Sequence, residues 1–420
     1  MGIQRATPLE VAKQIRIFNR KLRMEPALND VFTYSQATIK STDKNRVISD
    51  AIYLKLEPGS SDGRFVNVPM MTDLTGEPVE GTTTSQVGRE RRLNTKYCEA
   101  FSTDVSQAVT LEEYGLEALT KAPYQINEQA VKQLGKYKAE IMGRYHRQTL
   151  LESYSYNLNN TPHNLALMFS PNIFVAGATF AQQPRFANEP QRVGATVGAS
   201  PTAAGWATQI ATALINNGGA AATLRMLLQI EEYVSTHKYI PALSVGGASR
   251  YILLLPSNQC TYLKDPTVIG SMGDIFVERS CLNEAEMNFP NVLGRVGRLL
   301  IVEDERYPTL TVTGSAGNYG LTAQYRAPGR GANSDPRDHT QNGYDVGFVL
   351  GPECIIDKTD EDWHLEYQWE EYDKFYATGI FATLGMSMPL YKNGSITTAT
   401  NIQQDSSCAI IFGKPPADWV

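Results

Sequence analysis

Residues 52–109 have the sequence IYLKLEPGSSDGRFVNVPMMTDLTGEPVEGTTTSQVGRERRLNTKYCEAFSTDVSQAV, in which two alternating apolar segments enclose a long polar one. On the way out, the apolar positions are Ile52, Leu54, Leu56, Val66, Val68 and Met70, with a Pro/Gly/Ser turn between the two triplets. On the way back, Tyr97, Phe101 and Val105 share one face. This period of two predicts half-buried strands that leave the body of the molecule and return to it.

The tip between these strands, Thr72–Asn94, contains glycines, prolines and threonines but few large apolar side chains. It carries Glu80 and the basic residues Arg89, Arg91 and Arg92. A two-stranded hairpin of this length buries little surface and has unpaired edges, so it is marginal in water by itself. We therefore expect another surface to cover it, either on a neighbouring molecule or on the hairpin's own domain.

Length and composition bound the remaining possibilities. The chain has 420 residues, 42% of them hydrophobic, and a formal net charge of -6. This length allows two or three domains, and the acidic balance carries no bulk signature of nucleic-acid binding. The five cysteines are scattered and lack C-x-x-C spacing, as expected for reduced thiols. No signal peptide and no apolar run of roughly 18 residues is present, which predicts a soluble chain made in the cytoplasm.

The N-terminal segment is basic. Pro8–Arg23 has the apolar spacing of a helix, and no strong strand or core pattern follows up to Lys44. Residues 1–49 are therefore predicted to form an arm. Its charge could bind nucleic acid, a membrane or an acidic protein surface, or could simply form a solvated helix face. Its main basic residues are Arg16, Arg20, Lys21 and Arg23.

Two helices are predicted after the excursion. Thr110–Leu119 opens with an N-cap threonine and two glutamates. Ile126–Tyr154 keeps helical apolar spacing over roughly 40 Å and contains Gly135 and Gly143. Because glycine costs about 0.5–1 kcal/mol relative to alanine in a helix, these two positions mark a bend, a close approach of another backbone, or a core helix that tolerates them.

Farther along, apolar runs alternate with irregular stretches. Ser170–Ala222 is rich in Gly, Ala, Thr, Asn and Pro, which predicts an exposed loop insertion with one helix near Ala207–Ile215. Thr313–Gly343 is also predicted to be loop. The mixture of helices and buried strands predicts an α+β fold. The remaining predicted elements are a helix at Leu224–Tyr233 and strands at Tyr251–Leu255, Leu299–Val302 and Gly347–Leu350.

The longest predicted strand alternates strictly from Tyr376 to Met388. Before it, Glu353–Asp373 contains nine acidic residues against one lysine, a sign opposite to that of the arm and the tip. If these charges meet between copies of the chain, they steer register more than they supply affinity; alternatively, both are solvated surfaces. The residues predicted to make such contacts are Arg16, Arg20, Lys21, Arg23, Glu80, Arg89, Arg91, Arg92, Glu366, Glu370, Glu371 and Asp373.

Sequence motifs of catalysis, phosphate binding and metal binding are absent. No G-x-x-x-x-G-K-[ST] occurs, and the five histidines form neither H-x-x-x-H nor H-E-x-x-H. The single G-x-S-x-G, at Gly59, Ser61 and Gly63, lies in a turn between strands, without the helix that follows a nucleophile elbow. We therefore predict no enzyme, no cofactor and no catalytic, cofactor-binding or metal-binding residues.

The order of these parts resembles the major capsid protein of tailed bacteriophages, with its HK97-like fold. Residues 66–109 resemble that family's E-loop, and INEQAVKQLGKYKAEIMGRYHRQTLLESY resembles its long spine helix. SRYILLLPSNQCTYLKD resembles the axial-domain strand, while DVGFVLGPECII and YDKFYATGIFATLGMSMP resemble the late strands. The Ser170–Ala222 insertion is longer than expected for the simplest members.

The resemblance implies a domain organisation. It consists of an N-terminal arm (1–49), an E-loop (50–109), a peripheral domain with the spine helix (110–165), an axial domain with the Gly/Ala-rich insertion (166–340), and late strands with a C-terminal segment that returns to both domains (341–420).

The resemblance also implies a structural function. Such a subunit assembles into hexamers and pentamers of an icosahedral shell around double-stranded DNA, which it does not bind sequence-specifically. The expected partners are copies of itself, a scaffolding protein, a portal and, in some shells, a decoration protein, and the expected location is the virion, assembled in the bacterial cytoplasm. Because Met1 directly precedes the arm, we expect a separate scaffolding protein. Two alternatives stay open: a DNA-binding protein that uses the basic arm, and a soluble enzyme of unrecognised class.

Overall fold

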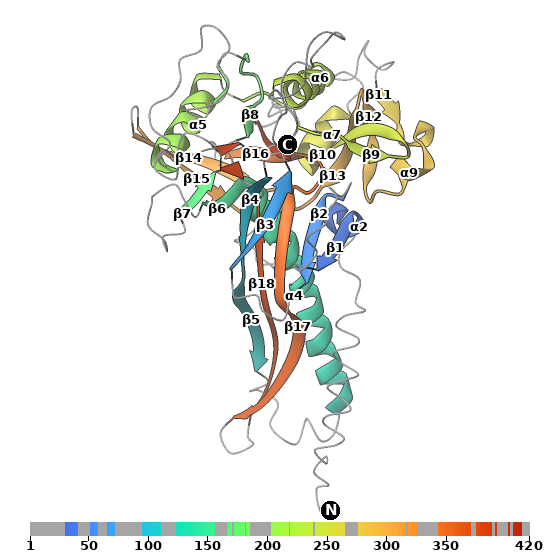
Figure 1. Cartoon of the computed structure of the whole chain (residues 1–420), viewed down its shortest axis with the longest axis vertical. Helices are drawn as coiled ribbons and strands as arrows, with labels where there is room; N and C mark the ends of the chain where they lie inside the picture. The colour runs from blue at the N-terminus through green and yellow to red at the C-terminus, as the bar shows by residue number, and fades with distance from the viewer. Residues whose placement is uncertain are drawn as a thin grey trace, which may run out of the picture.

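The structure is a computed structural model of the chain. It describes residues 30–40, 51–57, 65–71, 95–110, 123–155, 166–169, 172–180, 182–184, 203–217, 219–237, 240–264, 276–315, 318–325, 343–370, 375–388, 391–392, 402–403 and 406–413. Two sheets organise this part of the chain. A ten-stranded sheet lies in the upper half of Figure 1, and a five-stranded sheet extends downward from it beside a long helix.

The ten-stranded sheet is centred on β10 (Ala248–Pro256). This strand pairs parallel with β13 (Leu299–Asp304) and antiparallel with β16 (Gly343–Leu350). Neighbouring residues of β10 enter different buried clusters, Ile252 on one face and Leu253 on the other. The three strands predicted to be covered on both faces are thereby confirmed. The other strands of this sheet are β8 (Ile173–Val175), β9 (Leu243–Val245), β11 (Phe276–Glu278), β12 (Val292–Val296), β14 (Thr309–Ser315), β15 (Asn318–Gln324) and β21 (Ser407–Phe412).

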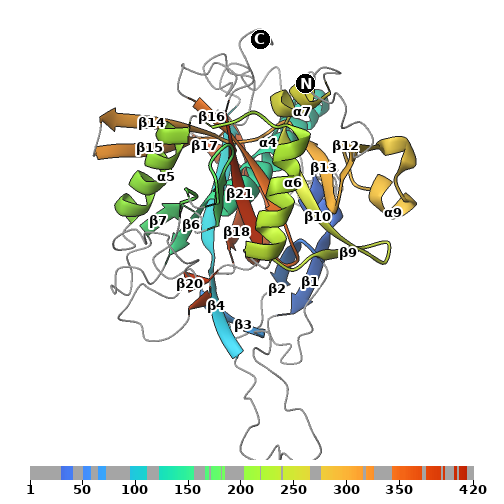
Figure 2. The ribbon, with the colours of Figure 1, turned by 90° about the horizontal axis from the view of Figure 1, so that it is seen from above.

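Helices cover this sheet. On one face lie α6 (Leu224–Glu232), continued by a π-helical turn at Tyr233–His237, and α7 (Ser257–Leu263). α6 begins where predicted, because the Thr223 hydroxyl accepts a hydrogen bond from the Met226 N–H at 3.3 Å. Figure 2 shows α6 crossing the sheet, with α5 beside the β14–β15 hairpin. The remaining helices are α5 (Ala203–Asn217), α9 (Glu284–Met287) and a short 3₁₀ turn at Arg279–Cys281.

The five-stranded sheet has the order β1-β2-β17-β18-β5. Its longest strands, β17 (Ile355–Glu370) and β18 (Phe375–Ser387), are antiparallel. Alternate residues of β18, among them Ile380 and Leu384, pack inward against α4 (Pro123–Leu151). The predicted one-sided strand is thus confirmed. The other strands are β1 (Gln36–Lys40), β2 (Tyr53–Glu57) and β5 (Thr103–Thr110).

The predicted long helix is α4. It runs without interruption across Gly135 and Gly143 and ends at Leu151, because the following residues form β6 (Glu152–Ser155), which pairs with β7 (Ala166–Phe169). Its last residues are buried under the ten-stranded sheet. α4 therefore joins the two halves of the described fold.

Residues 30–40 belong to the body rather than to an arm. α2 (Val31–Tyr34) buries Val31 and Phe32, and β1 pairs parallel with β2. Our expectation that no strand or core pattern precedes residue 45 is wrong for this segment. The signal is weak because α2 has four residues and β1 has five, so packing against the body, not local propensity, stabilises them.

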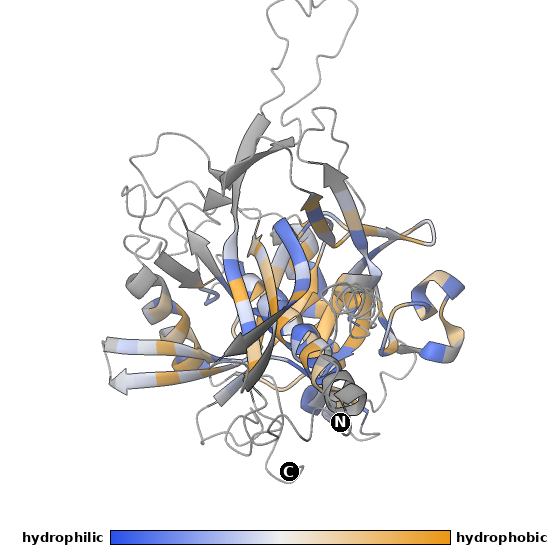
Figure 3. Ribbon diagram, turned by 90° about the horizontal axis from the view of Figure 1, so that it is seen from below, coloured by the Kyte–Doolittle hydropathy of each residue, from blue (hydrophilic) through white to orange (hydrophobic). Residues whose placement is uncertain are grey.

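Two stretches predicted to be loop contain strands of the sheet. Within Ser170–Ala222, β8 is buried and pairs parallel with β21, while the predicted helix is present and longer, as α5. Thr313–Gly343 contains the last three residues of β14 and all of β15, and these two strands pair over seven residue pairs. Figure 3 shows this hairpin projecting at the left in mostly pale colours. β8 gives a weak sequence signal because it has only three residues, and β14 and β15 give a weak one because they are rich in Thr and Gly and have few large apolar side chains.

The acidic band is a strand and is buried in part. β17 pairs with β2 as well as β18, and Glu353 and Asp357 are each 2% exposed. The alternative that the acidic band is a solvated surface is therefore wrong for these residues. Exposed carboxylates remain farther along β17, at Glu361, Asp362 and Glu366.

The returning strand of the excursion is divided. β3 (Phe65–Met71) and β4 (Thr95–Phe101) form a separate two-stranded sheet, whereas β5 joins the five-stranded sheet. β2 and β5 are not neighbours, because β17 and β18 lie between them. The excursion is thus a hairpin only in its outer part.

Several predicted features lie outside the described residues. They are the helix at Pro8–Arg23, the tip Thr72–Asn94 and all of Thr110–Leu119 except Thr110, which ends β5. Among the helices of the described residues, none has both the length and the apolarity needed to cross a membrane.

Candidate functional site

The β3–β4 ribbon is the part of the described structure best placed to meet another molecule. Its register runs from Phe65 opposite Phe101 to Met71 opposite Thr95, and neither strand joins a larger sheet. Figure 2 shows the β4 strand extending past the body. Pro69 lies within β3, as is usual only for an edge strand. A two-stranded ribbon is marginal in water unless it packs against something else. Within the described part of the chain, β4 contacts other elements, β17 and β18 among them, whereas β3 has its extensive contacts with β4 alone.

The ribbon is attached to the body at Ser102. This residue separates β4 from β5, is buried, and donates its hydroxyl hydrogen to the Asp360 carboxylate of β17. Asp360 also lies 3.3 Å from Nζ of the buried Lys358. The base of the ribbon is therefore held by a charge-assisted contact to the longest strand of the sheet.

β17 is irregular at this same place. Its register with β18 shifts once between Thr359 and Glu361 and again between Glu361 and His364. β17 thus has two more residues than its partner over this interval. Bulges increase twist and redirect side chains, and here Glu361 is exposed while Thr359 is buried.

A buried tyrosine–carboxylate pair lies just before this irregularity in β17. The Tyr53 hydroxyl of β2 donates to Asp357 of β17, and the Thr359 hydroxyl donates to the same carboxylate at 3.1 Å. Burial raises the pKa of Asp357 to about 6, although these two hydrogen bonds and Lys55 oppose the rise. Burial and the neighbouring Asp357 also raise the pKa of Tyr53. This pair fixes β2 beside β17 at the foot of the ribbon.

The exposed part of the acidic band lies on the outer side of the same strands. His364 is within 3.3 Å of Glu366 and 3.6 Å of Glu361, and Lys55 is 3.7 Å from Asp362. Each of these contacts is at the surface, where a single ion pair contributes about 0–1 kcal/mol. The surface is therefore available for charged contacts from outside the chain.

The predicted contact residues are only partly accounted for. Glu366 is exposed on β17, and Glu370 is the last residue of that strand, opposite Phe375. The ten others lie outside the described residues: Arg16, Arg20, Lys21, Arg23, Glu80, Arg89, Arg91, Arg92, Glu371 and Asp373.

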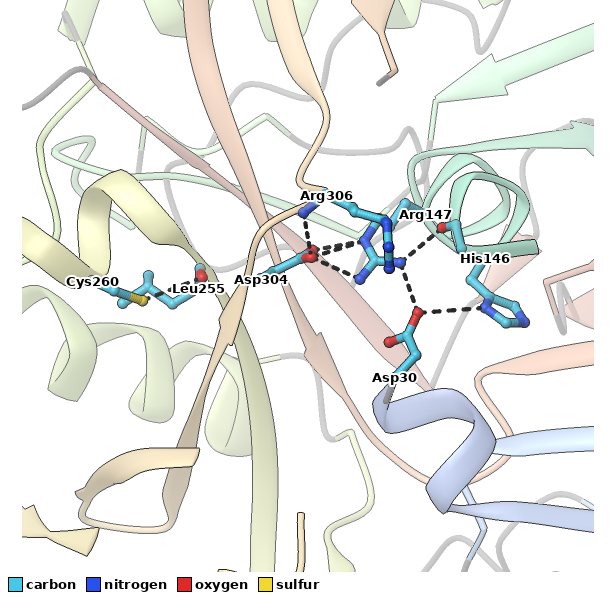
Figure 4. A network of polar contacts seen from close by, with 8 residues as sticks. Asp30, His146, Arg147, Leu255, Cys260, Asp304 and Arg306 are labelled. Atoms are coloured by element: carbon cyan, nitrogen blue, oxygen red, sulfur yellow. Dashed lines mark hydrogen bonds and ion pairs between the residues drawn. The ribbon is translucent and has the colours of Figure 1, made fainter. Parts of the chain in front are cut away.

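A buried charge cluster joins the two halves of the fold (Figure 4). Arg147 of α4 donates from Nε and Nη2 to Asp304 at 2.8 and 2.7 Å, and from Nη1 to Asp30 at 3.0 Å. Its Nη1 also donates to the carbonyl of Gly143 at 2.8 Å. Arg147 thus links the N-terminal segment, α4 and the end of β13.

The protonation states in this cluster follow from burial and charge. Burial alone would raise the pKa of Asp30, but the charge and hydrogen bond of Arg147, together with the charges of His146 and Arg306, outweigh it, so the pKa is lowered. Burial lowers the pKa of His146 to about 4, and its two ring nitrogens have no hydrogen-bond partner in the described part of the chain. Its ring lies between Phe32 and Tyr53, at centroid distances of 4.6 and 5.1 Å. His146 is therefore a neutral packing residue near pH 7.

The sequence predicted neither the Arg147 cluster nor the contact between Ser102 and Asp360. Arg147 is 117 residues from Asp30 and 157 from Asp304, and Asp360 is 258 residues from Ser102. No local pattern pairs charges so far apart. Gly143, noted in the sequence as a place of possible close approach, does lie beside the cluster, because a Cβ there would be 3.4 Å from Nη1 of Arg147.

These groups hold elements of the fold together. Within the described residues, no three His, Cys, Asp or Glu side chains lie close enough to hold a metal ion. The buried carboxylates of Asp30, Asp304 and Asp357 each accept a hydrogen bond from a neighbouring side chain. The arrangement stiffens a body from which one ribbon extends.

Comparison with known proteins identifies the fold. No protein-family model matches the chain, and a search of curated proteins finds no match. Among solved structures, the capsid of Ralstonia phage GP4 is similar with 13% identity and a TM-score of 0.52, covering 93% of each chain. The head structure of Helicobacter pylori bacteriophage KHP40 has 10% identity and a TM-score of 0.55, covering 99% of this chain and 95% of that one.

A third phage structure agrees. The capsid asymmetric unit of cyanophage Pam1 has 12% identity and a TM-score of 0.52, covering 94% of each chain. Similarity over nearly the full length of each chain means that the elements correspond in order and arrangement. The chain has the HK97-like capsid fold expected from its sequence.

Proposed function

We propose that this chain is the major capsid protein of a tailed bacteriophage, a structural subunit that assembles into hexamers and pentamers of an icosahedral shell. The observation that carries the proposal is the fold, which is that of phage capsid subunits. The β3–β4 ribbon fits this proposal, because its strands pair with each other and with no other strand of the described chain. The two alternatives, an arm-dependent DNA-binding protein and an enzyme, gain no comparable support.

The geometry suits a head-to-tail contact. The ribbon lies at one place on the surface, so the ribbon of one subunit would lie on a different surface of the next. Such a heterologous contact closes into rings when the rotation between subunits allows it. One contact can be weak, because many per subunit make a shell stable through multivalency.

Residues of opposite charge are available for that contact. The tip carries Arg89, Arg91 and Arg92, and the exposed side of β17 carries Glu361, Asp362 and Glu366. We assign the tip of one subunit to the acidic side of its neighbour, where opposite charges set register and discourage wrong partners. Glu80, Glu370, Glu371, Asp373 and the basic residues of the arm, Arg16, Arg20, Lys21 and Arg23, belong to the same proposed interface.

The proposed domain organisation follows from the assignment of the chain as a capsid subunit. The arm, the E-loop (50–109), the peripheral domain with α4, the axial domain and the late strands keep the order expected from the sequence, with residues 30–40 counted in the body. A bend of α4 at Gly135 or Gly143 remains a prediction.

The proposed partners are those of a phage head. They are other copies of the chain, a scaffolding protein, a portal, double-stranded DNA in the interior and, in some shells, a decoration protein. An overall negative charge of -6 suits a wall that encloses DNA without gripping its phosphates. The proposed location is the virion, and the proposed role is structural rather than catalytic.

Electron microscopy and sedimentation of the purified full chain test the proposal. Alone or with a scaffolding protein from the same source, the chain should form rings or closed shells. A protein that stays strictly monomeric at high concentration in both settings, with residues 72–94 protected from protease, contradicts it.

A further inference from the structure

A cavity of about 180 Å³ opens where the two halves of the fold meet. Its wall includes Asp30 of the N-terminal segment, Arg147 of α4 and the loop at Pro290 and Asn291. The turn after β13, residues 304–306, completes the wall. The cavity thus borders the charge cluster of Figure 4.

The cluster's acidic groups are already engaged. Asp304 accepts from Arg147 and from the backbone N–H of Arg306 at 2.9 Å, and Asp30 accepts from Arg147. Glu303, also in the wall, lies 3.6 Å from Nζ of Lys264. No carboxylate of the described residues forms an ion pair or a hydrogen bond with the guanidinium of Arg306.

The position of Arg306 is electrostatically unfavourable as it stands. Burial and the charge of Arg147 lower its pKa, and the charges of Asp30, Asp304 and Glu140 offset this only in part. Its aliphatic stem lies along α4, where a Cβ on Gly143 would be 3.4 Å from Cδ of Arg306. A guanidinium held beside a second guanidinium, at a polar cavity and without an acceptor, is a site for an anion.

We propose that this cavity binds an oxyanion, a carboxylate or a phosphate group, through the guanidinium of Arg306. The planar fork of arginine donates two parallel hydrogen bonds to either group. Two sources share this chemistry: a carboxylate side chain of a second copy of the chain, and a free phosphate in solution. Oxyanion binding itself goes beyond the proposed shell function and does not depend on it.

Thermal melting of the full chain tests the site. Inorganic phosphate is added in increasing amounts, with chloride holding the ionic strength constant. The melting temperature of the unmodified chain should rise by about 1–2 °C, and that of Arg306→Gln should not respond. Arg298→Gln is the matched control, because Arg298 is exposed and paired with Glu231 at 2.9 Å away from the cavity; its response should equal that of the unmodified chain.

Two results would overturn the proposal: no response of the unmodified chain to phosphate or acetate, or an equal response of Arg306→Gln. If Arg306→Gln is too unstable to compare, Arg306→Lys keeps the charge but loses the fork, and its response should be at most half that of the unmodified chain. An undiminished response of Arg306→Lys also counts against the site.

Light scattering during assembly distinguishes the sources. If a carboxylate of a second copy is the ligand, phosphate slows assembly of the unmodified chain, and Arg306→Gln assembles slowly whether or not phosphate is present. If a phosphate group is the ligand, phosphate raises the melting temperature without slowing assembly. This arm presumes the proposed shell function, whereas the melting arm does not, so a failure of one is distinguishable from a failure of the other.

Discussion

At the scale of single residues, Arg147 has the most demanding surroundings. It is 4% exposed and bridges two carboxylates that are 7% and 3% exposed. Taking such charges out of water costs several kcal/mol each, which only complete pairing offsets. The cluster is therefore stable as a set and vulnerable to the loss of one member.

Replacing Arg147 by methionine should lower the free energy of unfolding by about 3–5 kcal/mol, because Asp30 and Asp304 would be left buried without their donor. Urea unfolding followed by tryptophan fluorescence measures the change. Arg298→Met is the control: it removes the ion pair that the partly exposed Arg298 side chain makes with Glu231 near the surface, and the expected loss is about 1 kcal/mol or less. A similarly small loss for Arg147→Met would mean that the cluster does not support the junction.

Asp357 should make stability depend on pH. Its folded-state pKa of about 6 lies above the ordinary 3.8, so the folded protein binds the proton more tightly than the unfolded chain. This contribution is fully present below about pH 4 and is lost as the pH rises through 6, by up to about 3 kcal/mol. Asp357→Asn should flatten that part of the profile.

The measurement is urea unfolding at a series of pH values. Asp362→Asn, an exposed carboxylate on the same strand, should keep the slope of the unmodified chain. Tyr53→Phe removes a hydrogen bond that favours the ionised form, so the loss should extend to higher pH. A profile of Asp357→Asn that parallels the unmodified chain between pH 4 and 7 would refute the assignment.

At the scale of elements, α4 carries the connection between the sheets, and Gly143 is where other side chains approach it. A Cβ at this position would lie 3.4 Å from both Arg147 Nη1 and Arg306 Cδ, which is ordinary van der Waals contact. The helix therefore has room for one methyl group but not for a branched side chain.

Gly143→Ala should raise the free energy of unfolding by about 0.5–1 kcal/mol, since alanine restricts the unfolded chain and favours the helix. Gly143→Val, with two further atoms pressing on the charge cluster, should lower it. Thermal melting of the three proteins gives the order. If alanine destabilises as much as valine does, the helix needs a true glycine there.

The elements that could be predicted from the sequence are those whose own pattern of apolar residues indicates which face is buried. β10, β13, β18 and α4 have long apolar periodicity and were found where expected. β1, β8 and the β14–β15 hairpin were missed, because neighbouring strands stabilise them and their own side chains are short or few. The base of the ribbon was missed for a related reason: Ser102 and Asp360 acquire meaning only once β5 and β17 share a sheet.

At the scale of the whole molecule, the described fold consists of a body, built on the two large sheets, and the β3–β4 ribbon. Among the described strands, β3 and β4 pair with each other and join neither of the two large sheets of the body. Folding of the body and engagement of the ribbon should therefore be separable.

Removing residues 73–93 and closing the gap with a short glycine linker should leave the body folded but abolish shell formation. Cooperative thermal unfolding checks the body, and electron microscopy checks assembly. A control that keeps the length but changes Arg89, Arg91 and Arg92 to Gln should assemble weakly, because the tip retains its reach and loses its charge. Normal shells from the shortened chain, or a shortened chain that does not fold, would each contradict the proposed role of the tip.

The paired register shifts in β17 have a consequence for how this protein can change in evolution. Side chains alternate along a strand, so one extra residue would turn Trp363 and Leu365 from the core to solvent, whereas two restore their direction. Both are buried, although the strand between them and Thr359 departs twice from its partner's register. Related chains should therefore differ in length within this strand by even numbers of residues, and an odd insertion should survive only where a second one compensates for it.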